Sequence, residues 1–207
     1  LAHYLRCWWR PEDPHTFLMP HWNWKGKEGE EIRVRCYSNA AFIELRLNGR
    51  KISRRKMREN DKLEWRVPYE PGVLEAIGYD KDGREVSRAT NVTAGAPAKL
   101  ALKSTVIGDL AVIDAEVQDK DGNLCPHADN RIEFGVSRGT EILGVGNGNP
   151  YSHEPDKFTN KRKAYFGLCQ IIVRRTRPGA KITVKAKSGR LESSAITAWY
   201  CQKFYEK

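Results

Sequence analysis

The chain has 207 residues, of which 40% are hydrophobic and 30% are charged, and its formal net charge is +10. This length is enough for one large or two small domains, each with its own core. No apolar run approaches the roughly 18 residues that a membrane-spanning helix needs. The first ten residues contain Arg6 and Arg10 where a secretory signal would have an apolar core. We therefore expect no membrane partner, and no secretory signal is visible in these residues, which says little about a longer parent.

The positive charge raises the question of a nucleic-acid surface. Residues 1–95 contain 18 Lys and Arg against 14 Asp and Glu, and residues 96–207 contain 18 against 12, so the excess is spread along the chain. One local cluster lies at residues 50–58, directly after a predicted hairpin turn. A basic run of this kind is usually one solvated strand face. We therefore expect no nucleic-acid partner.

The cysteines, histidines and acidic turns predict neither a metal nor a cofactor. The five cysteines are never closer than 29 residues, and the five histidines are scattered, so no zinc-ligand spacing exists. Cys36 and Cys169 lie in strand-like runs, where a buried thiol behaves as a small apolar side chain. The Asp-Lys-Asp-Gly segments at 80–83 and 119–122 lack the other ligands and the helices of a calcium-binding EF-hand. Hairpin corners are the better interpretation of both.

The first ten residues are predicted to form the last turns of a helix, which Pro11 and Pro14 then end. Its large side chains are Tyr4, Leu5, Trp8 and Trp9. Ten helical residues cannot form a domain, so we expect this apolar face to be covered by a partner outside the chain. We assign residues 1–13 to a helical remnant that precedes the first domain.

Residues 14–95 predict an immunoglobulin-like β-sandwich. Apolar residues alternate with polar ones over short runs, as in half-buried strands. The alternating apolar residues are Ile32, Val34 and Cys36, then Ile43, Leu45 and Leu47, then Leu63, Trp65 and Val67. Asn48-Gly49 predicts a type I′ hairpin turn between two strands. With further strands at 73–79 and 84–90, about six short strands occur at the spacing of such a sandwich.

Residues 96–207 repeat this pattern after a connector at 93–97 that contains small residues and a proline. We expect strands near 99–103, 111–118, 132–136, 142–145, 165–173, 182–186 and 191–199. The chain is therefore predicted to be all-β, with two tandem immunoglobulin-like sandwiches after the short helix.

His21, Trp22 and Trp24 form the first candidate site. In an extended chain the two indoles would project to one face and Asn23 to the other. Such a pair could stack on a sugar ring, or it could be buried against a neighbouring domain, since tryptophan supplies a large apolar area at interfaces. We favour burial against that domain, and we expect both rings to be partly exposed in its absence.

The glycine-rich segment at 143–150 and the residues after it form the second candidate site. A phosphate-binding glycine loop leads into a helix N-terminus, whereas this segment leads into Pro150 and Pro155. Long loops held on a rigid sandwich often bind ligands. We name Asn149, Tyr151 and His153 as candidates for carbohydrate binding or for a domain interface.

Several motifs, in the same order, resemble bacterial β-galactosidases of glycoside hydrolase family 2. Residues 20–29, 37–39, 44–49 and 65–72 resemble the region directly after the catalytic barrel of these enzymes. Residues 117–123, 128–130, 146–155 and 164–168, including Gly146-Asn-Gly-Asn-Pro-Tyr-Ser-His-Glu-Pro155, resemble their C-terminal sandwich. The resemblance covers residues 14–198.

The resemblance implies a non-catalytic C-terminal accessory fragment of a retaining glycoside hydrolase. Its partner would be the catalytic barrel of the same parent chain, with residues 1–10 as the tail of the last barrel helix, and β-galactoside oligosaccharides are a further candidate partner. The two catalytic glutamates of the family lie in the barrel, so no catalytic residue is assigned here, and the fragment alone is expected to be inactive. A bacterial, secreted or periplasmic parent is expected. A carbohydrate-binding module or a cell-surface adhesion module is the alternative.

Overall fold

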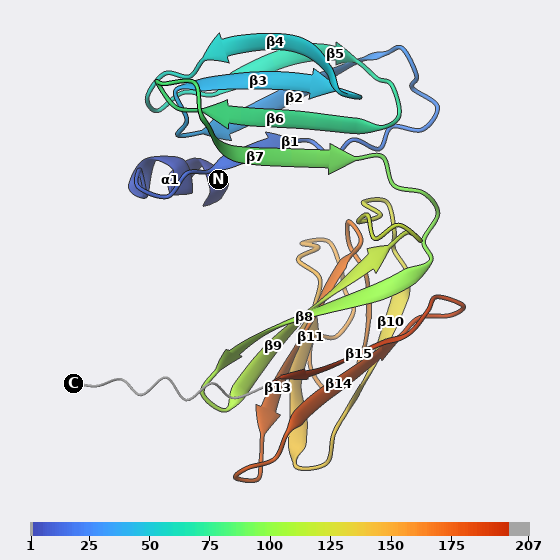
Figure 1. The fold of residues 1–207 in the computed structure, drawn as a ribbon. Helices are drawn as coiled ribbons and strands as arrows, with labels where there is room; N and C mark the ends of the chain where they lie inside the picture. The colour runs from blue at the N-terminus through green and yellow to red at the C-terminus, as the bar shows by residue number, and fades with distance from the viewer. Residues whose placement is uncertain (1, 199–207) are drawn as a thin grey trace, which may run out of the picture. The chain divides into compact units, whose positions relative to one another are not determined.

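The structure is a computed structural model that describes residues 2–198. The chain forms two compact units, Leu1–Thr93 and Ala94–Lys207, here called unit 1 and unit 2. Each unit consists of antiparallel sheets (Figure 1), which confirms the predicted all-β class. The division falls inside the connector at 93–97. Among the described residues, no helix is long and apolar enough to cross a membrane.

Unit 1 folds, over its described residues, into seven antiparallel strands in two sheets. The strands are β1 (Thr16–Met19), β2 (Glu31–Ser38), β3 (Phe42–Leu47), β4 (Arg50–Lys56), β5 (Leu63–Pro68), β6 (Val73–Tyr79) and β7 (Glu85–Val92). One sheet has the order β1-β2-β5 and the other has the order β4-β3-β6-β7. This is the two-layer arrangement of an immunoglobulin-like sandwich.

The period-two pattern of unit 1 is confirmed by burial. In β2, the side chains of Ile32, Val34 and Cys36 are buried between the sheets, while Glu31 and Arg33 are exposed. The turn between β3 and β4 places Asn48 at a φ of 51° and Gly49 at 77°. Two successive positive φ values are the mark of the predicted type I′ turn. Strand β1 was not predicted, because its four residues are too short to show a period.

The only helix among the described residues, α1 (Ala2–Trp9), packs on unit 1. Cys7 is fully buried and Trp8 packs against the core of this unit. The ring of Tyr4 lies edge-on to Tyr37 in β2, with 5.5 Å between centroids. The expectation that these aromatic residues need a cover from outside the chain is therefore wrong for Tyr4 and Trp8. Trp9, which is 75% exposed, is the aromatic residue of α1 that stays open.

Unit 2 contains eight strands within its described residues, again in two sheets. The strands are β8 (Lys99–Ile107), β9 (Leu110–Gln118), β10 (Arg131–Val136), β11 (Thr140–Gly146), β12 (Lys161–Lys163), β13 (Leu168–Arg175), β14 (Ile182–Lys187) and β15 (Ser194–Ala198). The sheets have the orders β11-β13-β9-β8 and β12-β10-β14-β15. Fully buried side chains such as Ile113, Ile132 and Ile171 fill the space between them. Strand β12, with three residues, was not predicted.

The described cysteines are free buried thiols rather than disulfide partners. They are Cys7, Cys36, Cys125 and Cys169, and Cys201 lies outside the described residues. Burial raises the pKa of Cys36 and of Cys169 to about 12. A thiol with such a pKa holds almost no thiolate at neutral pH, so neither side chain is a nucleophile.

The two Asp-Lys-Asp-Gly segments form corners built on their first aspartate. Oδ1 of Asp80 accepts hydrogen bonds from the amides of Asp82 and Arg84, and Oδ1 of Asp119 accepts the equivalent bonds from Asp121 and Asn123. Such side-chain-to-backbone bonds define the turns that aspartate favours.

Asp119 also orders the connector. Its Oδ2 accepts from the amide of Gly95 at 2.8 Å and from Nδ2 of Asn123 at 3.1 Å, and the residue is only 2% exposed. Burial acts to raise the pKa of this carboxyl, but the hydrogen bonds outweigh it and hold the pKa at about 2. The start of unit 2 is therefore fixed by a buried, ionised carboxylate.

We expect Asp119→Asn to destabilise unit 2 by about 1–3 kcal/mol, because the amide leaves the donors that face Oδ2 without an acceptor. The folded pKa of Asp119 is lowered, so its stabilisation is complete above the ordinary aspartate pKa of about 4 and is lost as the pH falls toward 2. The difference in free energy of unfolding between wild type and Asp119→Asn should therefore shrink as the pH falls from about 4 toward 2. Urea unfolding at pH 7, 4 and 3 measures this.

Asp80→Asn is the matched control, since both backbone bonds of Asp80 go to Oδ1, which asparagine retains. It should change the free energy of unfolding much less than Asp119→Asn. Parallel pH profiles for wild type and Asp119→Asn would contradict the assignment.

Candidate functional site

The long loop between β11 and β12, residues 147–160, is ordered by a chain of short turns. Oδ1 of Asn147 accepts from the amide of Asn149 at 3.0 Å, and Oδ1 of Asn149 accepts from the amide of Tyr151 at 3.0 Å. The hydroxyl of Ser152 accepts from the amide of Glu154 at 3.3 Å. Asparagine and serine favour such turns because their side chains replace a missing backbone partner. The loop is therefore a built structure.

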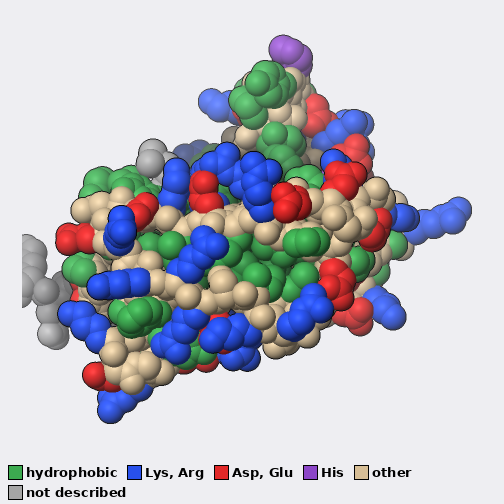
Figure 2. All heavy atoms as spheres, turned by 90° about the horizontal axis from the view of Figure 1, so that it is seen from above, with side chains coloured by type: hydrophobic (Ala, Val, Ile, Leu, Met, Phe, Trp, Pro, Cys, Tyr) green, Lys and Arg blue, Asp and Glu red, His purple; other side chains and the backbone are tan. Residues whose placement is uncertain are grey.

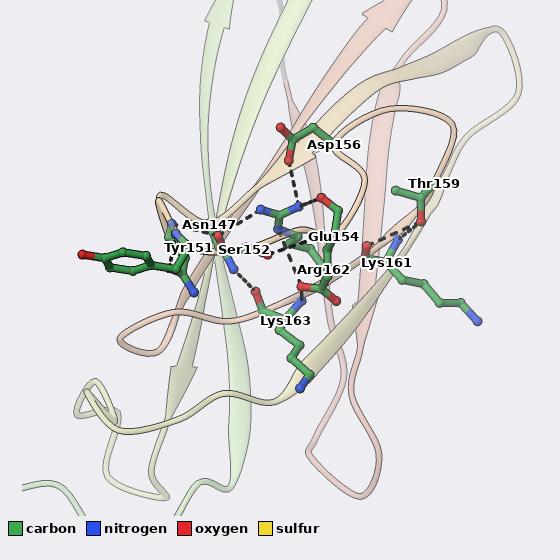
Figure 3. Close-up of polar contacts among 10 residues, drawn as sticks. Asn147, Tyr151, Ser152, Glu154, Asp156, Thr159, Lys161, Arg162 and Lys163 are labelled. Carbon is green, nitrogen blue, oxygen red and sulfur yellow. Dashed lines mark hydrogen bonds and ion pairs between the residues drawn. The ribbon is translucent and has the colours of Figure 1, made fainter.

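Arg162 in β12 anchors this loop through several hydrogen bonds (Figure 3). Its side chain is only 5% exposed. One guanidinium nitrogen, Nη1, donates to the carbonyl of Glu154 and to the carboxylate of Asp156, both at 2.7 Å, and Nη2 donates to Oδ1 of Asn147 at 3.2 Å. A buried charge is tolerated only when it is paired and hydrogen-bonded. One arginine therefore joins three points of the loop to the sheet.

A cleft of about 700 Å³ lies beside the loop 147–160. It is bounded by residues 143–150, by Arg162 and Asp156, and by side chains of β9 and β13. A second hollow of about 570 Å³ shares residues 146–148 and Gln170 with the first. A Cβ atom on Gly146 would meet no atom within 4 Å, so the backbone of this rim faces open space. Volumes of this size are typical of ligand sites.

The floor of the second hollow consists of paired polar side chains. Nε2 of Gln170 donates to Asp114 at 2.7 Å, and Lys103 forms an ion pair with Glu116 at 2.6 Å. These groups offer donors and acceptors to a hydroxylated ligand. Cross-strand pairs of this kind also occur on any solvent-facing sheet, so the floor alone does not define a ligand.

The structure separates the three candidates of the loop. Asn149 is half-buried and lines the cleft. Tyr151 is 84% exposed and points away from the Arg162 cluster (Figure 3), and His153 is also exposed. Only Asn149 of the three belongs to the cleft. Arg162 was not among the predicted site residues, although its place two residues before buried Ala164 in an alternating run marks it as inward-facing.

Trp22 is fully buried inside unit 1, so the prediction that both tryptophans are partly exposed is wrong for Trp22. Its indole N–H donates to the carbonyl of Glu70 at 2.9 Å, and its ring lies edge-on to Tyr69 with 5.2 Å between centroids. The carbonyl of Trp22 accepts from the hydroxyl of Thr93 at 2.6 Å. Trp22 is thus a core residue of its own unit.

Trp24 is half-buried and partly exposed, as expected. Its ring stacks on His21 with 4.8 Å between centroids, and its indole N–H donates to the carbonyl of His21. Between them, Asn23 is buried and donates to the carbonyl of Val92 at 3.0 Å. The segment 21–24 therefore joins the end of β7 to the core of unit 1 and presents no pair of indoles to a sugar.

The basic cluster at 50–58 is largely engaged within unit 1. The guanidinium of Arg54 lies 4.5 Å from the ring centroid of Tyr79, and that of Arg55 lies 5.2 Å from the centroid of Trp65. Lys51 forms an ion pair with Glu44 at 3.0 Å. On the face shown in Figure 2, Lys and Arg side chains are interspersed with acidic and apolar ones rather than gathered into one patch. The cluster fits a solvated strand face.

Comparisons with known proteins find relatives that match both units. Residues 103–197 match the family model described as glycoside hydrolase family 2 C-terminal domain 5, and residues 29–87 match a domain of unknown function, DUF4982. The chain is 40% identical over 191 residues to the β-galactosidase BoGH2A of Bacteroides ovatus, covering 87% of this chain and 22% of that protein. It is 30% identical over 209 residues to a β-glucuronidase of Formosa agariphila, covering 93% and 20%.

Among solved structures, a β-glycosidase from Bacteroides vulgatus superposes with a TM-score of 0.83 at 31% identity, covering 89% of this chain and 24% of that one. A glycosyl hydrolase family 2 member from Bacteroides cellulosilyticus gives a TM-score of 0.81 at 32% identity, covering 94% and 30%. The chain thus spans about a fifth of the length of the curated relatives it matches. Both of its units are similar to bacterial glycoside hydrolase family 2 proteins, and unit 2 matches a C-terminal domain of that family.

Proposed function

We propose that the chain is the non-catalytic C-terminal accessory region of a retaining glycoside hydrolase of the β-galactosidase type. In this role it supports the catalytic barrel of the same parent chain. The observation that carries the proposal is the continuous similarity over both units, at 40% identity, to a β-galactosidase of which the chain covers only 22%. Fold alone would not assign a function, whereas this similarity extends across two consecutive sandwiches and their connector.

The carboxyl groups whose pKa values are shifted among the described residues act as structural acceptors. Hydrogen bonds from Arg33 and then Arg35 hold the pKa of Glu64 at about 2, and that of Asp119 is also about 2. Such groups remain ionised and serve as structural acceptors.

The sugar specificity of the parent is a finer part of the proposal. The relatives include a β-galactosidase at 40% identity and a β-glucuronidase at 30%. The higher identity favours the galactosidase type. The sugar itself would be selected in the barrel, since accessory sandwiches do not form the catalytic subsite.

A second candidate function is oligosaccharide binding at the cleft of unit 2. The observation that favours it is the cleft of about 700 Å³, with Asn149 in its wall and an open glycine backbone at its rim. Amide side chains and free backbone groups are suitable partners for sugar hydroxyls.

The accessory role predicts two results. The purified 207-residue chain should show no turnover of a chromogenic β-galactoside. Removal of the same residues from the parent protein should lower its melting temperature by roughly 5 °C or more, since the barrel would lose the contacts that support it. Turnover by the isolated chain, or an unchanged melting temperature of the truncated parent, would contradict the role.

The binding candidate predicts that Gly146→Val weakens oligosaccharide affinity about tenfold, which corresponds to about 1.4 kcal/mol. The valine side chain would project into the open space of the cleft rim without backbone strain. Gly135→Val in β10 is the matched control, since a Cβ there also meets no atom within 4 Å and Gly135 is absent from the cleft lining. Titration with β-galacto-oligosaccharides followed by NMR measures both, and an unchanged wild-type spectrum at about 10 mM sugar removes this candidate.

A further inference from the structure

The two outer faces of unit 2 carry different charges. Residues two apart on a strand lie on the same side of a sheet. On the sheet β11-β13-β9-β8, the outward-facing charged residues balance, three basic against three acidic. They are Lys99, Lys103 and Arg174 against Asp114, Glu116 and Glu141. Ion pairs join Lys103 to Glu116 and Arg174 to Glu141. This face is electrically neutral.

The outer face of the sheet β12-β10-β14-β15 is instead strongly basic. Its outward-facing charged residues are five basic and one acidic, which gives a net charge of +4. Figure 3 shows Lys161 and Lys163 pointing away from the buried guanidinium of Arg162, which lies between them in sequence. The five basic residues, here called the basic face, are Arg131, Lys161, Lys163, Lys185 and Lys187, and the acidic one is Glu133.

The fold of unit 2 leaves three charges of the basic face without an acidic partner. Arg131 and Lys163 lie directly opposite each other on neighbouring strands, where like charges are destabilising. Glu133 pairs with the two lysines on either side of it, at 3.3 and 3.5 Å. Among the described residues, no carboxylate pairs with the side chain of Arg131, Lys163 or Lys185. A bound anion would offset the repulsion that remains.

A hollow of about 280 Å³ lies within the basic face. Its lining residues are Arg131, Glu133, Lys161, Lys187, Ser188 and Gly189. Two residues along β10 from Glu133, a Cβ atom on Gly135 would meet no atom within 4 Å, so a ligand can approach the backbone there. Neighbouring strands lie about 4.8 Å apart, and residues two apart on one strand lie about 7 Å apart. The cations therefore form an extended array, which fits a ligand with repeated anionic groups better than a single small anion.

We propose that the basic face of unit 2 binds an anionic polysaccharide, whose repeated carboxylate or sulfate groups contact the five cations. The choice of a polysaccharide rests on the proposed function, since a glycoside hydrolase acts on glycans. The charge of the face is complementary to such a chain, and lysine offers a point charge that accepts either kind of anionic group. The site is separate from the cleft beside the loop 147–160, because the two share no lining residue.

The side chains of the basic face fit a polysaccharide better than they fit a nucleic acid or an acidic protein. The outward-facing positions of the four strands hold no aromatic side chain, so no ring is available for a base to stack on. These positions also hold no apolar side chain larger than alanine. Protein interfaces have an apolar centre and are depleted in lysine, whereas four of these five cations are lysines.

The test measures the affinity of the purified chain for polygalacturonate at several salt concentrations. The double variant Arg131→Gln/Lys163→Gln should weaken binding at least about tenfold at roughly 50 mM salt, and it should reduce the slope of log K against log salt by about one or more. The variant should fold at least as stably as wild type, because it removes a like-charge pair, and urea unfolding checks this. Should it not fold, Lys185→Gln is the second variant, and its slope should fall by up to about one.

Lys99→Gln/Arg174→Gln is the matched control, because it removes one lysine and one arginine from the neutral face of the same unit. It should leave the affinity within about twofold of wild type, although the net charge of the chain changes equally. Equal weakening by the control and by the double variant would overturn the proposal, as would unchanged binding by Lys185→Gln.

The choice of ligand is tested with three further probes. Absence of polygalacturonate binding at roughly 50 mM salt, or equal binding of neutral galactan, would overturn the proposal. Tighter binding of duplex DNA would overturn it in favour of a nucleic acid, and tighter binding of poly-glutamate would overturn it in favour of an acidic protein. These results do not decide the accessory function, which fails only if the isolated chain turns over the chromogenic galactoside or if truncation leaves the melting temperature of the parent unchanged.

Discussion

The buried guanidinium of Arg162 is the contact on which the loop 147–160 of unit 2 depends. Its charge is removed from water, which costs several kcal/mol unless carboxylate and carbonyl partners surround it. Asp156, Glu154 and Asn147 supply those partners from three separate points of the loop. The loop has no regular secondary structure, so its short side-chain turns and Arg162 together determine its shape. The wall of the cleft follows from that shape.

Unit 1 also has an irregular segment whose polar atoms need hydrogen-bond partners, and here both the donors and the acceptors are neutral. The segment 21–24 has no strand partner, and its polar atoms bond to the ends of other elements: Trp22 to Glu70 and Thr93, and Asn23 to Val92. Each bond is modest, but an unsatisfied buried donor would be costly. The rings of Trp22 and Tyr69 are therefore part of the core of unit 1, although Trp9 stays exposed. Unit 2 leaves Tyr151 and Phe158 exposed on an equally ordered segment.

The sequence predicts what is local and regular in this fold. The alternation of Ile32, Val34 and Cys36, and the Asn48-Gly49 turn, follow from side-chain period and backbone preference alone. Strands β1 and β12 are too short to show a period. The burial of Trp22 depends on Tyr69 and Glu70, which lie far along the chain. The spacing of Trp22 and Trp24 alone could therefore not predict that the first is buried and the second partly exposed. The burial of Arg162 could be predicted from its alternation with Ala164, which marks an inward side chain. Arginine is rarely buried in proteins, however, so composition argues against that prediction.

Asn149 and Tyr151 lie on the same ordered loop but face different surroundings. Asn149 lines the cleft together with the glycine backbone of its rim, whereas the ring of Tyr151 points away from the Arg162 cluster (Figure 3). Because Arg162 orders the loop through Glu154, Asp156 and Asn147, a change of the Tyr151 side chain alters the cleft only if it disturbs those contacts.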